Sequence, residues 1–261
     1  MNVSWRNPIF ALCIGVLVLV TASYGVLAQQ VARPIPVRGI PSSPALDIQS
    51  AAVRYLPDLD MLVFEQHLKG MAGSVQPTPM GQLDGAAVLG YVFPTTLPPE
   101  DVGFNSSDGI LALAVTSHPD FDDTPLWDEN SDRDYGNDGQ IWHAHWVVLH
   151  PDDRVAGGLS VLEFRDGDPD VVLPSTHPPM PMYIDSPGFS IIERNNTVQV
   201  LVPAQRVNHV TDFSFDAVTA YMQVNTSDPS RPMLGVYKVY SVSSGDLSLP
   251  YSVQIHSQKD E

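Results

Sequence analysis

The residues with the clearest chemical potential are two histidines one residue apart, in the segment Trp142-His143-Ala144-His145-Trp146. In a β-strand, residues two apart project to the same face, with their Cα atoms about 6.5 to 7 Å apart. Two imidazoles placed in this way can bind one metal ion, as His-x-His pairs do in β-rich metalloproteins. The simpler alternative is a pair of ordinary strand histidines. Trp142 and Trp146 are expected in the core on the opposite face.

Further metal ligands must come from other segments. His118 follows the apolar segment 110–117 and would lie beside the doublet if that segment pairs with residues 141–150. His209 could also approach through folding. Imidazoles without thiolate favour Zn²⁺ or Cu²⁺, and a carboxylate such as Asp120 would admit Fe²⁺. The sequence therefore predicts a copper or zinc site at His143 and His145, completed by His118 or His209.

Between His118 and the doublet, residues 120–138 carry eight acidic side chains against one basic residue, Arg133. Crowded carboxylates repel one another unless a cation, water or backbone donors offset the repulsion. The oxygen ligands expected for Ca²⁺ are Asp128, Asn130, Asp132, Asp134 and Asp138. Their spacing resembles the start of an EF-hand loop, but Arg133 replaces the turn glycine and Gly139 stands where the bidentate Glu belongs. We predict a looser calcium loop, with a solvated acidic loop as the alternative.

A second possible metal patch combines His177 with Met180 and Met182. An imidazole beside two thioethers could bind Cu⁺, a soft ion that accepts sulfur ligands. Methionines also fill gaps in apolar cores, and the prolines around this patch favour a stiff extended loop. The packing role is the stronger expectation here.

Common catalytic signatures are missing from the sequence: it has no His-Glu-x-x-His, no phosphate-binding glycine loop, no dinucleotide fingerprint and no nucleophile elbow. Gly139 and the His143-Ala144-His145 doublet resemble part of the first cupin motif. Leu149 and His150, however, stand where that motif would have its Glu. A cupin-like metal-dependent enzyme is therefore an alternative, and a non-catalytic protein is the main expectation.

Three non-catalytic functions fit the composition. A copper or zinc carrier would keep its histidines accessible to solvent. A carbohydrate-binding module would instead expose aromatic side chains in a groove braced by Ca²⁺. The aromatic candidates are Trp127, Tyr135, Trp142 and Trp146. The third possibility is a surface protein that binds another protein, with the acidic loop keeping it in solution.

The elements that would position these residues are short strands. Apolar and β-branched runs alternate with clusters of Pro, Gly, Asp and Asn, and no long stretch keeps a helical period. The expected strands are 48–55, 61–68, 86–93, 110–117, 141–150, 159–164, 197–202, 213–224 and 235–243. Residues 57–60 are expected to close a hairpin between the first two. This pattern predicts a single all-β domain, an antiparallel β-sandwich or an open barrel.

The N-terminal segment is predicted to be a secretory signal, residues 1–28, because an apolar run follows a weakly basic start and precedes the small-residue site Val26-Leu27-Ala28. An uncleaved anchor is the alternative. A Pro-rich linker, 29–46, would follow, and then the β domain, 47–261. Cys13, the only cysteine, lies in the leader, so a cleaved chain would have no disulfide and no thiolate ligand. A secreted or periplasmic location is expected.

The charge balance restricts the partners. The chain carries 30 acidic residues against 13 Lys and Arg, a formal net charge of −17. Nucleic-acid backbones and anionic membranes attract cationic surfaces and repel such a chain. We therefore expect metal ions as partners, with a glycan or protein as a further possibility, and neither nucleic acid nor an anionic membrane surface.

Overall fold

The computed structural model describes residues 39–256, except 125–127, 129–130 and 134–137. The chain divides into two units, Met1–Arg33 and Pro34–Glu261, and all of the described residues belong to the second. The predicted leader and most of the predicted linker lie outside the described ranges, so both stay predictions. Within those ranges, no helix is long and apolar enough to cross a membrane.

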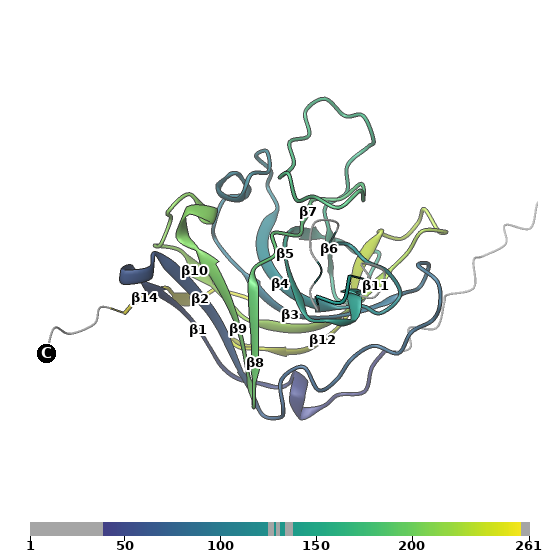
Figure 1. Ribbon diagram of the computed structural model, residues 1–261. Coiled ribbons are helices and arrows are strands. Elements are labelled where there is room, and N and C mark those ends of the chain that lie inside the picture. Colours follow the sequence, from purple (N-terminus) through teal and green to yellow (C-terminus); the bar gives the residue numbers. More distant parts are fainter. Residues whose placement is uncertain (1–38, 125–127, 129–130, 134–137, 257–261) are drawn as a thin grey trace, which may run out of the picture. The chain divides into compact units, whose positions relative to one another are not determined.

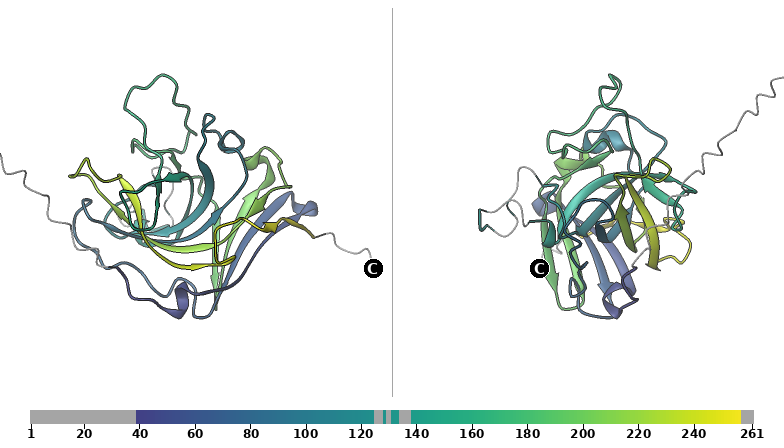
Figure 2. Two further views of the ribbon diagram at one scale, coloured as in Figure 1. Left: turned by 180° about the vertical axis from the view of Figure 1, so that it is seen from behind. Right: turned by 90° about the vertical axis from the view of Figure 1, so that its right-hand side faces the viewer.

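Six strands close into an antiparallel barrel (Figures 1 and 2). Each strand pairs with the next around the ring, and the last pairing, between the fourth and fifth strands of the chain, closes it. In chain order these strands are β3 (Ala87–Pro94), β4 (Ile110–Ser117), β5 (His143–Pro151), β6 (Leu159–Val161), β11 (Val218–Val224) and β12 (Leu234–Val242). A two-residue strand, β7 (Ile184–Asp185), adds to β5.

A second sheet has five strands in the order β14-β1-β2-β9-β8. Their bounds are β1 (Ile48–Leu56), β2 (Met61–Leu68), β8 (Ser190–Arg194), β9 (Thr197–Pro203) and β14 (Gln254–Ile255). Two further short strands, β10 (Ser214–Phe215) and β13 (Tyr251–Ser252), pair with each other. The helical elements are short 3-10 turns: η1 (Pro44–Leu46), η2 (Pro57–Leu59), η3 (Pro99–Val102), η4 (Asp138–Gln140) and η5 (Ala204–Val207).

Most predicted strands coincide with observed ones, and the predicted hairpin between β1 and β2 is confirmed. Proline begins η2, and Asp60 ends it in the left-handed region at φ 47°. The predicted strand 213–224 is divided into β10 and β11. The division falls at Asp216, whose carboxylate accepts the N–H groups of Ala217 and Ser244 and so replaces the strand pairing there.

The barrel wall separates two hydrophobic cores, and β5 shows how. Trp146 and Val148 face a core shared with the five-stranded sheet, where Trp146 packs edge-on against Phe64 with ring centroids 6.2 Å apart. Val147 and Leu149 face a second core inside the barrel. The period of two along β5 therefore places His145 on the inner side of the wall.

The all-β prediction is confirmed. The finer expectation, a sandwich or an open barrel, is not confirmed as stated, because the larger sheet closes on itself while a second sheet covers part of its outer surface. Closure depends on the pairing of β4 with β5 across 25 intervening residues, from Ser117 to His143. The same pairing creates the site described next.

Candidate metal centre

The pairing of β4 with β5 brings distant histidines together. In this register Thr116 lies opposite His143, and Ala114 lies opposite His145. His118 follows the end of β4 and continues along it, since its N–H donates to the carbonyl of Gly139 at 2.6 Å. The prediction that His118 would lie beside the start of the second strand is confirmed.

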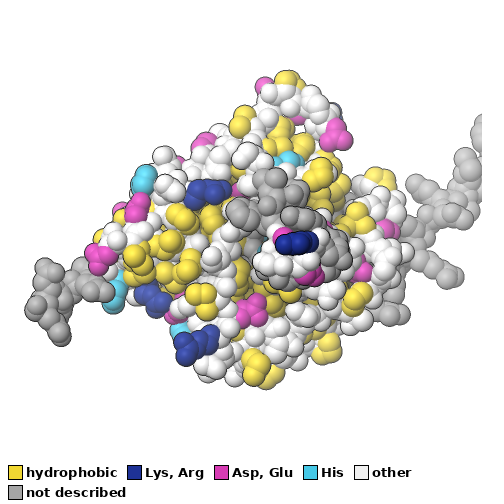
Figure 3. Space-filling model, in the orientation of Figure 1, with side chains coloured by type: hydrophobic (Ala, Val, Ile, Leu, Met, Phe, Trp, Pro, Cys, Tyr) yellow, Lys and Arg dark blue, Asp and Glu magenta, His cyan; other side chains and the backbone are white. Residues whose placement is uncertain are grey.

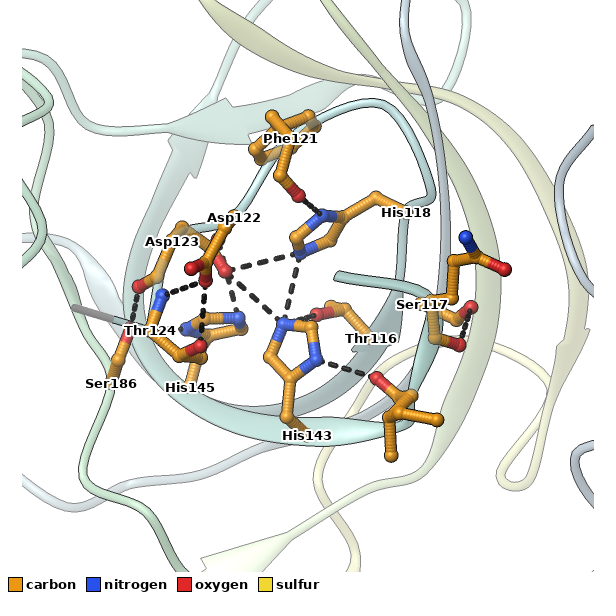
Figure 4. A network of polar contacts seen from close by, with 12 residues as sticks. Thr116, Ser117, His118, Phe121, Asp122, Asp123, Thr124, His143, His145 and Ser186 are labelled. Carbon is orange, nitrogen blue, oxygen red and sulfur yellow. Dashed lines mark hydrogen bonds and ion pairs between the residues drawn. The ribbon is translucent and has the colours of Figure 1, made fainter. Parts of the chain in front are cut away.

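Four side chains converge at this end of the barrel: His118, Asp123, His143 and His145 (Figure 4). Each offers one ligand atom, and these atoms all lie within 4.8 Å of one another. All four residues are buried, with exposed fractions between 1% and 4%. Buried titratable groups in such proximity are costly unless they are paired or bind an ion. The cluster could hold a metal.

The Asp123 carboxylate is the centre of the cluster. Its Oδ1 lies 3.1 Å from Nε2 of His143 and 3.2 Å from Nε2 of His118, and its Oδ2 lies 3.3 Å from Nε2 of His145. Two ligand atoms about 2.0 to 2.1 Å from a tetrahedral ion are separated by roughly 3.3 Å. The observed separations are close to those expected around a single ion.

The other nitrogen of each imidazole fixes its orientation. Nδ1 of His118 donates to the carbonyl of Phe121 at 3.0 Å, and Nδ1 of His143 donates to that of Ile141 at 2.6 Å. Nδ1 of His145 lies 3.2 Å from the carbonyl of Asp185. A carbonyl oxygen only accepts, so each Nδ1 carries the proton and each Nε2 of a neutral ring presents a lone pair. Metal-bound histidines are oriented by such outer hydrogen bonds.

Two contacts inside the cluster call for a cation. Nε2 of His118 and Nε2 of His143 are only 2.9 Å apart, and two lone pairs at this distance repel. Nε2 of His145 is buried and has no hydrogen-bond partner among the described residues, although it lies 3.3 Å from an Asp123 oxygen. A proton on one ring would relieve the first contact, whereas one metal ion would satisfy all three nitrogens and the carboxylate.

The electrostatics favour a neutral His145 beside an ionised Asp123 carboxylate. Burial lowers the pKa of His145 to about 3, against the opposing effect of the Asp123 charge. Burial alone would raise the pKa of Asp123, but His118 and His145 reverse this and hold it well below its usual range. Neutral imidazole and carboxylate are the forms that bind metals.

Asp123 was missed at the sequence level, where Asp120 was the candidate carboxylate. Asp120 instead accepts the N–H groups of Met80 and Gly81 at 2.7 and 2.6 Å. The chain turns back after His118 so that Asp123 faces the cluster, and its carbonyl accepts the hydroxyl of Ser186 at 2.6 Å. The acidic run directly after His118 was the available signal, but it did not reveal which carboxylate would point inward.

Gly139 has a packing role in this turn. An added Cβ there would clash with the carbonyl oxygens of Phe121 and His118 and lie 2.9 Å from His118 Nδ1. Gly139, which stands where an EF-hand loop would have its bidentate Glu, thus allows the segment after β4 to approach the segment before β5.

His209 does not join the cluster. It is exposed, and its Nδ1 lies 3.3 Å from the carboxylate of Asp60 at the hairpin between β1 and β2. The structure thus brings together His118, His143 and His145 of the predicted histidines, and leaves His209 elsewhere.

The predicted calcium ligands are only partly described. The carboxylate of Asp128 accepts the N–H groups of Asp132 and Arg133 at 3.1 and 2.8 Å, which orders a turn. Asn130, Asp134 and the side chain of Asp138 lie outside the described residues. The calcium loop stays a prediction.

The remaining candidate patches have packing roles. Met182 is buried in the barrel core, with Met180 packed against that core, while Nδ1 of His177 donates to the carbonyl of Ile184 at 2.8 Å. Trp142 and Trp146 are buried on the outer side of the barrel wall, as predicted for core aromatics. These two are therefore unavailable to a sugar-binding groove, and the other two candidates, Trp127 and Tyr135, lie outside the described residues.

Comparison of the chain with models of protein families, with curated proteins and with solved structures finds no match. The chemistry of the cluster is therefore inferred from its own side chains. Three oriented imidazole nitrogens and one carboxylate, all buried, form a ligand set for a single metal ion.

Proposed function

We propose that the protein is exported and binds one divalent transition-metal ion through His118, Asp123, His143 and His145. The observation that supports this most directly is the convergence of three Nε2 atoms on one carboxylate, while backbone carbonyls hold the opposite side of each ring. Histidines that only packed in a core would not require all three Nε2 lone pairs to point toward one carboxylate.

Zinc and copper are the metals we propose, since imidazole nitrogens suit both ions. The carboxylate of Asp123 makes Fe²⁺ a further candidate, as carboxylate with imidazole is typical of non-haem iron sites. No cysteine is present in the β domain, so thiolate-dependent copper sites are excluded.

The burial of the cluster favours a resident ion over a transported one. A carrier exchanges its metal with partners and needs accessible ligands, whereas these four side chains are at most 4% exposed. Outer hydrogen bonds to Phe121, Ile141 and Asp185 would also slow release by holding the ligands in place.

The test is elemental analysis of the protein purified from its native host without chelator. We expect one equivalent of zinc, copper or iron per chain. His143→Ala and His145→Ala should abolish it, and His209→Ala, which removes an exposed histidine outside the cluster, should retain it. Circular dichroism of each variant would separate loss of the ion from loss of the fold. A folded wild-type protein without stoichiometric metal would overturn the proposal.

A further inference from the structure

A cavity lies inside the barrel. Its volume is about 90 Å³, and apolar side chains of β3, β5, β11 and β12 form most of its wall. A void needs only about 10 to 15 Å³ of such space to hold one water molecule, and close-packed protein interiors contain few voids larger than that. The cavity is therefore large enough for a molecule bigger than water.

The polar atoms on the wall are engaged outside the cavity. The polar side chains that take part in the lining are Thr116, His118, Asp123, His145 and Thr226. The two histidines and the aspartate direct their polar atoms toward one another and toward backbone carbonyls. The hydroxyl of Thr116 lies 3.4 Å from Nε2 of His143, and that of Thr226 donates to the carboxylate of Asp84 at 3.3 Å. The surface of the cavity is accordingly almost wholly apolar.

Such a surface excludes water and polar ligands. A buried water molecule typically makes about three hydrogen bonds, and cavities without polar partners stay dry and bind apolar molecules such as benzene or xenon. A charged or hydroxylated ligand would likewise lose its hydrogen bonds to water without replacing them. The wall therefore selects an uncharged apolar molecule.

The wall can adapt to its content. Four methionines line the cavity: Met180, Met182, Met222 and Met233. Methionine has several rotatable bonds and a polarisable thioether, so it adjusts to different apolar shapes. The cavity would therefore accept apolar molecules of more than one shape.

The cavity reaches the surface along β12. This strand pairs with β6 at one residue pair, Gly235 with Ser160, and then continues to Val242. Val239, on this continuation, lines the cavity and is 37% exposed. The inside of the barrel is therefore accessible from solvent at this part of β12.

From these features we infer that the barrel binds a small, uncharged apolar molecule in this cavity. The inference goes beyond the proposed function and does not require the metal ion, because the cavity presents hydrocarbon rather than the ligand atoms of the cluster. The barrel would thus hold a metal site and an apolar binding site side by side.

The inference is tested by isothermal titration of the purified protein with benzene and with phenol, which has nearly the same shape and adds one hydroxyl. We expect benzene to bind, and phenol to bind at least about five-fold more weakly, because its hydroxyl would be buried without a partner. No binding of benzene, or equal binding of the two molecules, would overturn the inference.

The methionines report where benzene binds. In protein that is isotopically labelled at the methionine methyl groups, bound benzene should give nuclear Overhauser effects to Met182 and Met222. Met71 is the internal control, because it is 67% exposed and lies outside the cavity lining. Effects at Met71 without effects at the cavity methionines would contradict the proposed location.

A cavity-filling variant tests the location a second time. Ala220 is buried on β11 and lines the cavity, so Ala220→Leu should abolish the binding of benzene. Ala52→Leu is the matched control, because Ala52 on β1 is partly exposed and lies outside the cavity lining. If Ala220→Leu does not fold, the smaller Ala220→Val should still weaken binding. Unchanged affinity for benzene in a folded cavity variant would contradict the inference.

The two proposals fail independently. Wild-type protein that binds benzene in the cavity but holds no stoichiometric metal refutes the metal site alone. Protein that holds one metal ion but does not bind benzene refutes the apolar site alone.

Discussion

At the scale of single residues, Asp123 is the centre of the candidate metal site. It is buried, ionised and in contact with three histidines. A buried carboxylate that faces three imidazole nitrogens needs a cation, either a proton or a metal ion, to offset the repulsion between its charge and their lone pairs. The role of Asp123 can be separated from that of its acidic neighbours by substitution.

We expect Asp123→Asn to lower the affinity for the metal by at least about ten-fold, since the amide keeps the volume but loses the charge that the ion requires. Competition with a chromophoric chelator would measure the change. Asp120→Asn is the control. Asp120 accepts two backbone N–H groups outside the cluster, so its variant should bind metal as the wild type does. Equal affinities of the two variants would remove Asp123 from the ligand set.

At the scale of elements, the five-stranded sheet contains a buried charge network centred on Glu65 of β2. The guanidinium of Arg54 on β1 donates to both carboxylate oxygens at 3.1 and 2.8 Å, and His67 and Gln199 add further hydrogen bonds. Burial raises the pKa of Glu65, but these partners reverse the effect and lower it below its ordinary value. The network therefore ties three neighbouring strands together.

The lowered pKa of Glu65 makes a contribution to stability that is present above its unfolded-state pKa and is lost as the pH falls through the folded-state pKa. Glu65→Gln should lower the free energy of unfolding by about 1 to 3 kcal/mol at pH 7. The difference from wild type should shrink between pH 7 and about pH 3, because the stabilisation is lost as the pH falls through the folded-state pKa, which lies below the ordinary value of about 4.3. Urea unfolding at both pH values measures this. A difference that stays constant with pH would contradict the assignment.

The predicted calcium loop, residues 120–138, can be tested separately. If the loop binds Ca²⁺, the ion should raise the melting temperature, because a ligand that binds only the native state stabilises it by mass action, by about 2.7 kcal/mol at a hundred times its dissociation constant. Asp132→Ala combined with Asp134→Ala should abolish the increase. An unchanged melting temperature of the wild type with and without Ca²⁺ would leave a solvated acidic loop.

At the scale of the whole molecule, the cluster of His118, Asp123, His143 and His145 joins β4, β5 and the loop between them, so an ion bound there would contribute to closure of the barrel. Removal of the ion would leave the 2.9 Å contact between His118 and His143 without a compensating cation. Removal with a chelator should therefore lower the melting temperature, and one equivalent of Zn²⁺ should restore it. Calorimetry of both forms measures the shift. Identical melting of the two forms would contradict a site that stabilises the fold.

The surface gives no reason to revise the expected partners. On the face shown in Figure 3, Lys and Arg side chains are scattered rather than gathered into one patch. The formal net charge of −17 likewise disfavours binding to nucleic acid and to anionic membranes. The expectation that the chain binds neither nucleic acid nor anionic membranes stays a prediction, since both need a concentrated cationic surface.

The sequence by itself determined what depends on local periodicity. It predicted an all-β chain, most strand positions, the hairpin at Pro57, and the common face of His143 and His145 with tryptophans on the other side. These features follow from the period of two along a strand, which neighbouring residues alone define.

Only the tertiary structure decided which distant groups meet. Closure of the barrel, the inward direction of Asp123, the separate position of His209 and the apolar cavity beside the cluster all depend on strand pairings between segments far apart in the chain. Many acidic residues follow His118, and spacing alone does not distinguish the one that faces inward. The path of the loop determines which carboxylate faces the cluster. Gly139 allows the close approach that this path requires, and the hydroxyl of Ser186 donates to the carbonyl of Asp123.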